Sequence, residues 1–253
     1  MSHQLFSTLI VLCLFVFHTR SVSAEENFLL IDHATDQVIL QLGAGIHERV
    51  SPCSTFKIAL GLIGYDSGIL KDQWTPVWDF QEGYVDYREI WKASQTPQSW
   101  MKNSCIWYSQ VLAVELGIDT IATYLKLLEY GNQDMSGGLT EAWLGSSLKI
   151  SPAEQVRLIR RIIQENLPIE ASAIQLTKTL LFLKELEGGW KLFGKTGMWS
   201  SNEEIGWFVG WIEKEKTFFP FAYNICDQKI DAERRISRVM ELLFESKLIG
   251  EKQ

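Results

Sequence analysis

Histidine is scarce in this sequence, and this limits the kinds of active site that the chain can build. Of its four histidines, only His33 and His47 lie beyond the first 24 residues. Histidine is the commonest metal ligand in proteins and the usual base beside a serine nucleophile. Two histidines, both early in the chain, argue against a His-rich zinc site and against Ser-His-Asp catalysis. We therefore expect no metal and a different base.

Long basic runs are also lacking, although the chain contains 24 Lys and Arg residues. The formal net charge is −7, and the acidic residues are scattered among the basic ones. Because nucleic-acid-binding proteins concentrate basic residues in one patch, we expect no nucleic acid partner. Hydrophobic residues make up 46% of the 253 residues, enough to bury a large core in one unit or in two closely joined lobes.

An uninterrupted apolar run is confined to the N-terminus, at residues 9–17, and small residues follow it at 22–24. A membrane span needs about 20 apolar residues, so the run is short for a span. We predict a signal peptide at residues 1–24, cleaved after Ala24, with export to the periplasm and no stable membrane anchor. The first eight residues contain no Lys or Arg, which keeps a retained anchor as the alternative.

Cysteine is too infrequent to staple the fold. Removal of residues 1–24 leaves Cys53, Cys105 and Cys226. An odd number of cysteines cannot complete a disulfide framework in an exported protein. We expect Cys53 and Cys105 to be small buried thiols.

The hydrophobic pattern changes from strand to helix and back to strand along the chain. Residues 28–42 resemble a hairpin, and strand-like runs occupy residues 190–198, 205–213 and 217–225. Helical patterns fill the region between them and return over residues 232–248. The pattern predicts an α/β (α+β) fold, with one antiparallel sheet assembled from both ends of the chain and flanked by the first and last helices.

We place the whole of residues 25–253 in a single domain, with an all-helical lobe at roughly 66–186. Ser51 is expected to cap a helix in which Pro52 takes the first position, and Ser151 to open a capping box with Glu154. The last helix of the lobe is expected to cover residues 171–186 and to stop at the following Gly-Gly pair.

The stretch PCSTFKIA, residues 52–59, contains a serine and a lysine with chemical potential. Ser54 and Lys57 are three residues apart, so a helix brings their side chains to one face. Burial against apolar neighbours lowers the pKa of a lysine, and a neutral lysine is a plausible base for a serine nucleophile. The S-x-x-K pattern alone occurs roughly once by chance in a chain of this size. A surface lysine is therefore the alternative for Lys57.

Two further motifs change this balance. Lys195-Thr196-Gly197 lies in a strand-like segment, and such a triplet is expected by chance in about one chain in twenty of this length. Ser104-Cys105-Ile106 lies between Ser54 and this triplet and is the only reasonable S-x-aliphatic candidate in a loop between helices. The order S-x-x-K, S-x-aliphatic, K-T-G resembles that of the penicillin-recognising serine enzymes.

Within that superfamily the chain looks most like the class D β-lactamases, or oxacillinases. Additional matches are Tyr130-Gly131-Asn132 and the segment AWLGSSLKISPAEQ at residues 142–155. The resemblance extends over nearly the whole chain after residue 24. It implies the fold of the penicillin-recognising serine enzymes and hydrolysis of the β-lactam amide of penicillin-type antibiotics, which gives antibiotic resistance.

The resemblance also implies a mechanism. Ser54 would form the acyl-enzyme, and Lys57 would be modified by CO2 to N6-carboxylysine, the general base, with no other cofactor. Ile106 and Trp143 match the positions that border this carbamate, and Ile106 departs from the usual Val. Ser104 and Lys195 would complete the catalytic set.

Substrate binding is implied at the third motif and the last helix. The backbone N–H groups of Ser54 and Met198 would form an oxyanion hole beside Gly197, and Thr196 would bind the substrate carboxylate. An arginine of the last helix would assist, with Arg235 favoured over its neighbour Arg234. The ligand would be a β-lactam antibiotic, and a homodimer is compatible with the sequence.

Two alternatives share the acylation machinery. A peptidoglycan D,D-carboxypeptidase or transpeptidase would release the acyl group slowly, but its middle motif is usually S-x-N. A non-catalytic β-lactam sensor would stay acylated and needs a membrane-spanning signalling part, for which only residues 1–24 offer a candidate.

Overall fold

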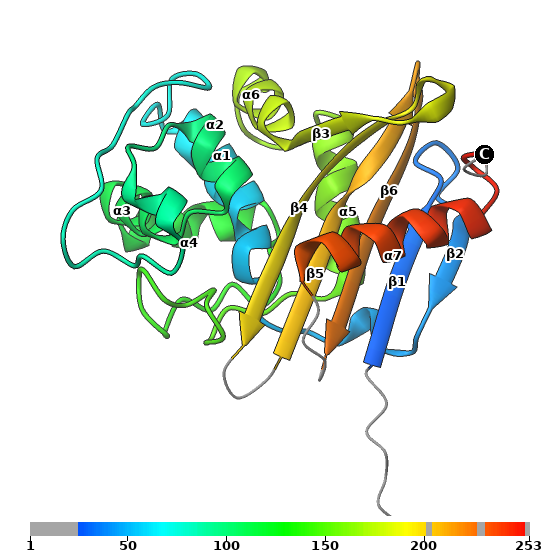
Figure 1. Cartoon of the computed structure of the whole chain (residues 1–253), viewed down its shortest axis with the longest axis horizontal. Coiled ribbons are helices and arrows are strands. Elements are labelled where there is room, and N and C mark those ends of the chain that lie inside the picture. The colour runs from blue at the N-terminus through cyan, green and yellow to red at the C-terminus, as the bar shows by residue number, and fades with distance from the viewer. Residues whose placement is uncertain (1–24, 201–203, 227–230, 251–253) are drawn as a thin grey trace, which may run out of the picture.

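The computed structural model describes residues 25–200, 204–226 and 231–250. The predicted signal peptide at residues 1–24 lies outside these ranges. Within them, the strands form one antiparallel sheet in the order β2-β1-β6-β5-β4-β3 (Figure 1). Their bounds are β1 (Glu25–Ile31), β2 (Val38–Leu42), β3 (Phe182–Glu185), β4 (Lys191–Ser200), β5 (Glu204–Lys214) and β6 (Thr217–Cys226).

The helical segments lie mostly between β2 and β3, as the sequence pattern predicts. The α-helices are α1 (Lys57–Asp66), α2 (Pro97–Asn103), α3 (Ile106–Leu116), α4 (Ile118–Leu127), α5 (Pro152–Ile163), α6 (Ala171–Leu181) and α7 (Ala232–Glu245). Short 3-10 helices are η1 (Gly45–His47), η2 (Cys53–Phe56), η3 (Glu89–Lys92) and η4 (Glu187–Gly189). Among the described residues, none of these helices combines the length and apolar character needed to cross a membrane.

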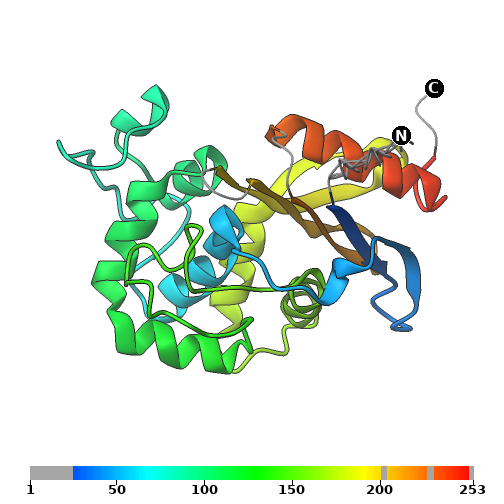
Figure 2. The ribbon, with the colours of Figure 1, turned by 90° about the horizontal axis from the view of Figure 1, so that it is seen from below.

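The central pairing confirms that both ends of the chain build the sheet. Strand β1 pairs with β6 near the C-terminus, with Phe28 opposite Tyr223. Helix α7 covers one face, and α5 lies against the other face together with the helical lobe (Figures 1 and 2). The fold is therefore the predicted α+β arrangement.

Side chains along the strands point alternately to the two faces of the sheet, so they pack in two separate parts of the core. In β5, Val209 and Trp211 face the large cluster shared with the helical lobe, whereas Phe208 and Ile212 pack in the smaller cluster under α7. This is the two-residue period of a strand buried on both faces. The sheet is thus held rigidly between two apolar layers, one of which carries α1.

The prediction of a helix over residues 171–186 was wrong at its end. Helix α6 ends at Leu181, and the next four residues form β3, with Phe182 opposite Phe193 and Lys184 opposite Leu192 of β4. Pairing with the open edge of β4 outweighs the local preference for helix. These four residues therefore belong to the sheet and not to the helical lobe.

The helix start at Ser51 also differs from the prediction. Pro52 precedes the 3-10 segment η2, and no side-chain cap is present there. The Ser51 hydroxyl instead donates to the Trp143 carbonyl oxygen at 2.8 Å and accepts from the Gly145 N–H at 2.9 Å. The Ser51 hydroxyl thus bonds to Trp143, 92 residues away in the sequence, and does not cap the helix as the local pattern predicted.

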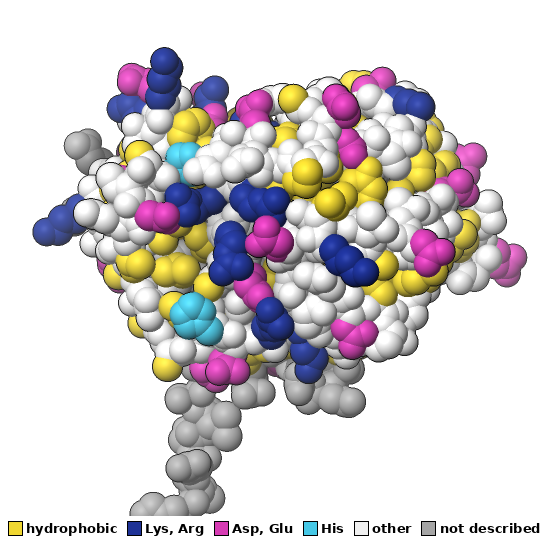
Figure 3. Space-filling view, turned by 180° about the vertical axis from the view of Figure 1, so that it is seen from behind, with side chains coloured by type: hydrophobic (Ala, Val, Ile, Leu, Met, Phe, Trp, Pro, Cys, Tyr) yellow, Lys and Arg dark blue, Asp and Glu magenta, His cyan; other side chains and the backbone are white. Residues whose placement is uncertain are grey.

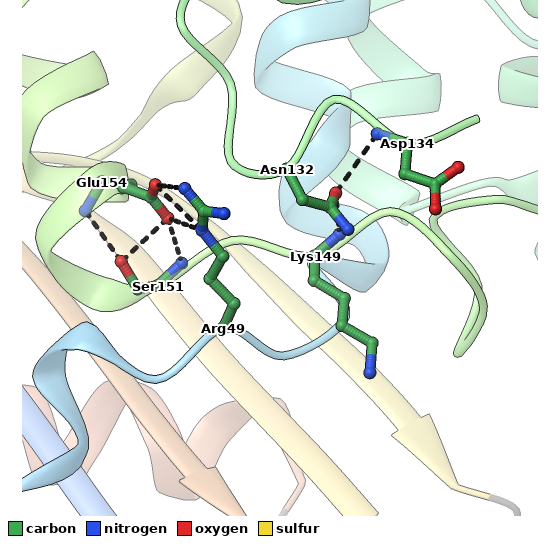
Figure 4. Close-up of polar contacts among 6 residues, drawn as sticks. All are labelled: Arg49, Asn132, Asp134, Lys149, Ser151 and Glu154. Carbon is green, nitrogen blue, oxygen red and sulfur yellow. Dashed lines mark hydrogen bonds and ion pairs between the residues drawn. The ribbon is translucent and has the colours of Figure 1, made fainter. Parts of the chain in front are cut away.

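The predicted capping box at Ser151 is confirmed. The Ser151 hydroxyl accepts from the Glu154 N–H at 3.3 Å, and the Glu154 carboxylate accepts from the Ser151 N–H at 3.0 Å (Figure 4). The same carboxylate pairs with Arg49 from the segment before η2. This group ties α5 to the chain that leads into the first helix.

On the rear face, Lys and Arg side chains are interleaved with Asp and Glu side chains (Figure 3). Ion pairs of α5 contribute here, including Arg160 with Asp36 at 2.6 Å and Arg161 with Glu129 at 3.4 Å. Charges of both signs at short range compensate one another, so this face is held by many weak pairs.

Candidate active site

Ser54 and Lys57 meet at the junction between η2 and α1. Residues three apart in a 3-10 turn lie directly above one another, because the turn contains three residues. The Lys57 Nζ donates to the Ser54 Oγ at 3.3 Å. Ser54 is 9% exposed and Lys57 is 1% exposed. The serine therefore keeps a small exposed surface, and the lysine is buried beside it.

Burial lowers the pKa of Lys57 to about 7, while the nearby thiols of Cys105 and Cys53 act in the opposite direction. No carboxylate is among the groups that shift this pKa in the described part of the chain. An amine with such a pKa is largely neutral at slightly alkaline pH and so can accept a proton. The surface-lysine alternative for Lys57 is wrong.

Ser104 and Lys195 form a second pair, although they are 91 residues apart. Ser104 ends α2 with a left-handed backbone, φ 58° and ψ 33°, which turns the chain into α3. The Lys195 Nζ donates to the Ser104 Oγ at 2.9 Å and to the Thr196 carbonyl oxygen at 3.0 Å. The tight turn at the end of α2 thereby directs a hydroxyl toward β4.

The two pairs share one site. Lys195 is 5% exposed. Burial is the largest cause of a pKa well below its ordinary value, and the charge of Lys57 is the next cause. Two ammonium groups close enough to affect each other favour the loss of a proton from one of them. The arrangement therefore places two hydroxyls and two amines with lowered pKa around one pocket.

Gly197 permits β4 to approach the turn that carries Ser54. A Cβ atom at Gly197 would lie 2.9 Å from the Pro52 carbonyl oxygen and 3.2 Å from the Ser54 nitrogen. On either side of Gly197, Thr196 is half-buried and Met198 is 47% exposed. The K-T-G segment thus lines the pocket with backbone on one side of Ser54.

The structure distinguishes the two arginine candidates of α7. Arg234 is exposed, whereas Arg235 is 2% exposed. A Cβ atom at Gly206 of β5 would lie 2.8 Å from the Arg235 Cδ, so the arginine side chain crosses the sheet over a glycine. The charge of Arg235 also contributes to the lowered pKa of Lys195. Arg235 is therefore the arginine directed toward the pocket.

Trp143 and Ile106 lie in the apolar surroundings of this pocket. Trp143 is 1% exposed and stacks at a tilt on Phe56, with ring centroids 5.1 Å apart. Its carbonyl oxygen accepts from the Cys53 N–H at 3.0 Å. Half-buried Ile106 begins α3 and packs against the same cluster. Cys53 and Cys105 are buried free thiols, as expected.

The Tyr130-Gly131-Asn132 motif holds a loop, in agreement with a scaffolding role. The Asn132 amide oxygen accepts from the Lys149 N–H at 2.9 Å and from the Asp134 N–H at 3.3 Å (Figure 4). A Cβ atom at Gly131, where φ is 49°, would lie 2.0 Å from the Lys149 carbonyl oxygen. This loop positions the chain segment that continues into Ser151 and α5.

Comparisons with known proteins agree with this geometry. The family model for the penicillin binding protein transpeptidase domain matches residues 25–241. The β-lactamase OXA-1 of Escherichia coli is 43% identical over 198 residues, which cover 74% of this chain and 71% of that protein. The solved structure of the class D β-lactamase OXA-427 is similar with a TM-score of 0.81 and 35% identity, covering 88% of this chain and all of that one. The chain belongs to the class D β-lactamases.

This class D β-lactamase also resembles a regulatory protein. BlaR1 of Bacillus licheniformis is 33% identical over 210 residues, which cover 82% of this chain and 34% of that protein. This relative is named as a regulatory protein, and the match spans about a third of its length.

Sequence reasoning missed two contributors to the site of this β-lactamase. Gln155 of α5 donates to the Thr55 hydroxyl at 2.9 Å, and that hydroxyl donates to the Pro52 carbonyl oxygen at 2.7 Å. Gln155 could have been found from the sequence, because it is a polar residue on the apolar face of α5. The second is Arg88, whose charge also acts on the pKa of Lys195. It lies in an irregular segment where no pattern distinguishes it.

Metal ligands are not gathered anywhere in residues 25–200, 204–226 and 231–250, where no three His, Cys, Asp or Glu side chains could share an ion. The donors around Ser54 are amines, hydroxyls and backbone N–H groups. This donor set suits an anionic ligand or a developing oxyanion.

Proposed function

We propose that this chain hydrolyses the β-lactam amide of penicillin-type antibiotics through an acyl-enzyme on Ser54, and so confers antibiotic resistance. One observation carries the proposal: the Lys57 Nζ lies 3.3 Å from the Ser54 Oγ and has a pKa lowered by burial to about 7. A nucleophile within hydrogen-bond reach of a base that is free at neutral pH is the requirement for acyl transfer by serine.

Acylation follows from the two hydrogen-bonded pairs. The base at Lys57 takes the Ser54 proton while Ser54 Oγ bonds to the lactam carbonyl carbon, and the lactam C–N bond breaks. The leaving nitrogen takes a proton from the Ser104 hydroxyl, which is restored through Lys195 at 2.9 Å. The lowered pKa of Lys195 supports proton transfer along this pair.

Stabilisation of the oxyanion and of the substrate carboxylate would come from the other wall. We assign the oxyanion hole to the N–H groups of Ser54 and Met198, which Gly197 brings close together by allowing β4 to pack on the turn. Thr196 and Arg235 would bind the substrate carboxylate, since a charged donor and a hydroxyl form strong hydrogen bonds with it.

We propose that Lys57 is carboxylated, and its burial supports this. Reaction of an amine with CO2 requires the neutral form and a pocket from which water is excluded, and Lys57 is 1% exposed with a lowered pKa. When carboxylated, Lys57 would supply a carbamate oxygen as the general base, with Trp143 and Ile106 bordering it. A base at this position is needed twice, because water must also lose a proton to attack the acyl ester.

Timed mass spectrometry of the protein mixed with benzylpenicillin tests the proposal. A hydrolase gives an adduct on Ser54 that appears and then disappears while penicilloate accumulates. The sensor alternative, favoured by the similarity to the regulatory protein BlaR1, and a transpeptidase both predict an adduct that persists. Export to the periplasm after removal of residues 1–24 is also part of the proposal, and N-terminal sequencing of secreted protein checks it.

A further inference from the structure

The segment between α1 and α2 carries a cation at the edge of the active site that the mechanism above does not use. Arg88 is exposed and immediately precedes η3. Its Nη1 donates to the Asn103 carbonyl oxygen at 3.1 Å. Asn103 is followed directly by Ser104, whose hydroxyl accepts from Lys195. The guanidinium is therefore held one residue away from the catalytic motif.

Neighbouring carboxylates do not neutralise this guanidinium. Asp86 and Glu89 flank Arg88 in the sequence, but both pair with Lys92, at 3.8 and 2.9 Å. Within the described part of the chain, no ion pair joins Arg88 to an acidic side chain. An arginine has five N–H donors, so the bond to Asn103 leaves donors for a ligand.

The backbone around Arg88 is well anchored. The Trp91 indole N–H donates to the same Asn103 carbonyl oxygen at 2.9 Å, and the Trp107 indole N–H donates to the Trp91 carbonyl oxygen at 2.8 Å. Trp91 is 4% exposed and Trp107 is 1% exposed. Two buried indoles thus fix η3 to α2 and α3. The backbone at residue 88 should therefore stay in place when the Arg88 side chain is replaced.

Arg88 and Arg235 reach the active site from different elements: Arg88 bonds to Asn103, next to Ser104, whereas Arg235 lies over Gly206, the partner of Met198 in the sheet. The segment between α1 and α2, teal in Figure 2, and the orange-red helix α7 lie on the two sides of the start of α1. Both guanidinium charges contribute to the lowered pKa of Lys195. The site therefore has a buried cation at Arg235 and an exposed cation at Arg88, on different elements.

A penicillin extends to both sides of its scissile lactam bond. Its ring carboxylate is on one side of the lactam carbonyl and its acylamino side chain is on the other. With the ring carboxylate directed toward Thr196 and Arg235, the side chain extends toward the wall that contains Arg88. Exposed Tyr87, at 79%, stands beside it as an apolar contact for the rest of that side chain.

We propose that Arg88 is a specificity-determining residue that favours β-lactams whose acyl side chain carries its own carboxylate. The inference rests on the proposed function. A planar guanidinium binds a carboxylate through two parallel hydrogen bonds, and an exposed pair of this kind contributes a modest amount. Its effect would appear in the choice between substrates, because an effect of its charge on the pKa of Lys195 is common to both substrates and cancels in their ratio.

Carbenicillin and benzylpenicillin form a matched pair for the test, since they differ by one carboxylate on the side chain. The ratio of their kcat/KM values is measured for the wild type, Arg88→Met and Arg88→Lys. We expect Arg88→Met to lower the carbenicillin-to-benzylpenicillin ratio about fivefold, and Arg88→Lys to keep most of it. Arg157→Ala removes an exposed arginine from α5 and serves as the control for net charge.

The salt dependence of the ratio tests whether Arg88 acts through its charge. In the wild type, 0.5 M NaCl should reduce the ratio, because salt screens an exposed charge pair. An unchanged ratio in Arg88→Met, or an equal loss of both substrates, would refute the inference, since an equal loss places the guanidinium on the group common to both. Thermal unfolding checks that each variant is folded. Absence of turnover with either penicillin in the wild type would contradict the proposed function itself.

Discussion

Charged groups behave in opposite ways on the two sides of this molecule. In the pocket, Lys57 and Lys195 are almost fully buried, and each has a lowered pKa. On the rear face, Arg49 and Glu154 pair with one another at the start of α5 (Figure 4). The pocket holds its amines where the charged form is disfavoured, whereas the rear face pairs its charges.

The difference shows that the residues needed for catalysis reduce the stability of the folded state. A buried amine that lacks a carboxylate partner destabilises the folded state when it is protonated. The same environment leaves the amine able to take a proton from a hydroxyl. Paired charges in contact with water neither destabilise the folded state in this way nor accept a proton. Substitutions in the pocket should therefore change activity, and substitutions on the rear face should change only stability.

The largest effect is expected from Lys57→Ala. Both half-reactions lose their base, so kcat/KM for benzylpenicillin should fall by a factor of about 10³ or more. Arg49→Ala is the matched control, because it removes a cation from the rear face and should leave kcat/KM within about twofold. Steady-state hydrolysis measures both, and normal turnover by Lys57→Ala would show that the lysine is not the base.

Replacement of the apolar border of the pocket should reduce stability and change the bicarbonate response. Trp143→Ala removes a buried indole that packs on Phe56, which should cost about 3–5 kcal/mol in the free energy of unfolding. Water admitted beside Lys57 would also make activity depend more strongly on added bicarbonate. Denaturant unfolding and assays with and without bicarbonate measure these effects. An unchanged bicarbonate response would remove Trp143 from the proposed carbamate pocket.

The buried amine should leave a signature in the pH dependence of stability. Because the folded-state pKa of Lys57 is about 7 and lies below its ordinary value of 10.5, the unfolded chain binds more protons between these pH values. Stability due to this group therefore rises with pH from about 7 to 10.5. Lys57→Met should be more stable than the wild type by roughly 1–4 kcal/mol at pH 6, and the difference should shrink above about pH 7.

Urea unfolding of Lys57→Met and of the wild type in bicarbonate-free buffer at several pH values measures this. Ser151→Ala supplies the comparison, since the cap is not expected to titrate between pH 7 and 10.5. A difference for Lys57→Met that stays constant with pH would mean that the lysine is charged in the folded state.

The smallest effect is expected on the rear face. Ser151→Ala removes the capping hydroxyl of α5, at a cost of about 1 kcal/mol in the free energy of unfolding. Its kcat/KM should stay near that of the wild type, because the hydrogen bond that joins α5 to the turn carrying Ser54 comes from Gln155 and not from Ser151. Thermal unfolding and hydrolysis assays check both values, and a large loss of activity would mean that the two sides are coupled.

Local patterns predicted much of the fold and the residues of the site. The two-residue period of the late strands and the capping box at Ser151 are set by neighbouring residues, and the structure confirms them. The end of α6 was predicted wrongly, because Phe182 pairs with a strand that only the folded chain places beside it. Arg88 was missed for the same reason.

By itself, the sequence determined that Ser54 and Lys57 lie within reach of one another, because they are three residues apart in a turn of the chain. The tertiary structure alone decided the chemistry of that pair. Lys57 is almost fully buried, and Cys105, 48 residues along the chain, is among the groups that act on its pKa. Desolvation is a property of packed surroundings, so no local pattern could specify the pKa on which the site depends.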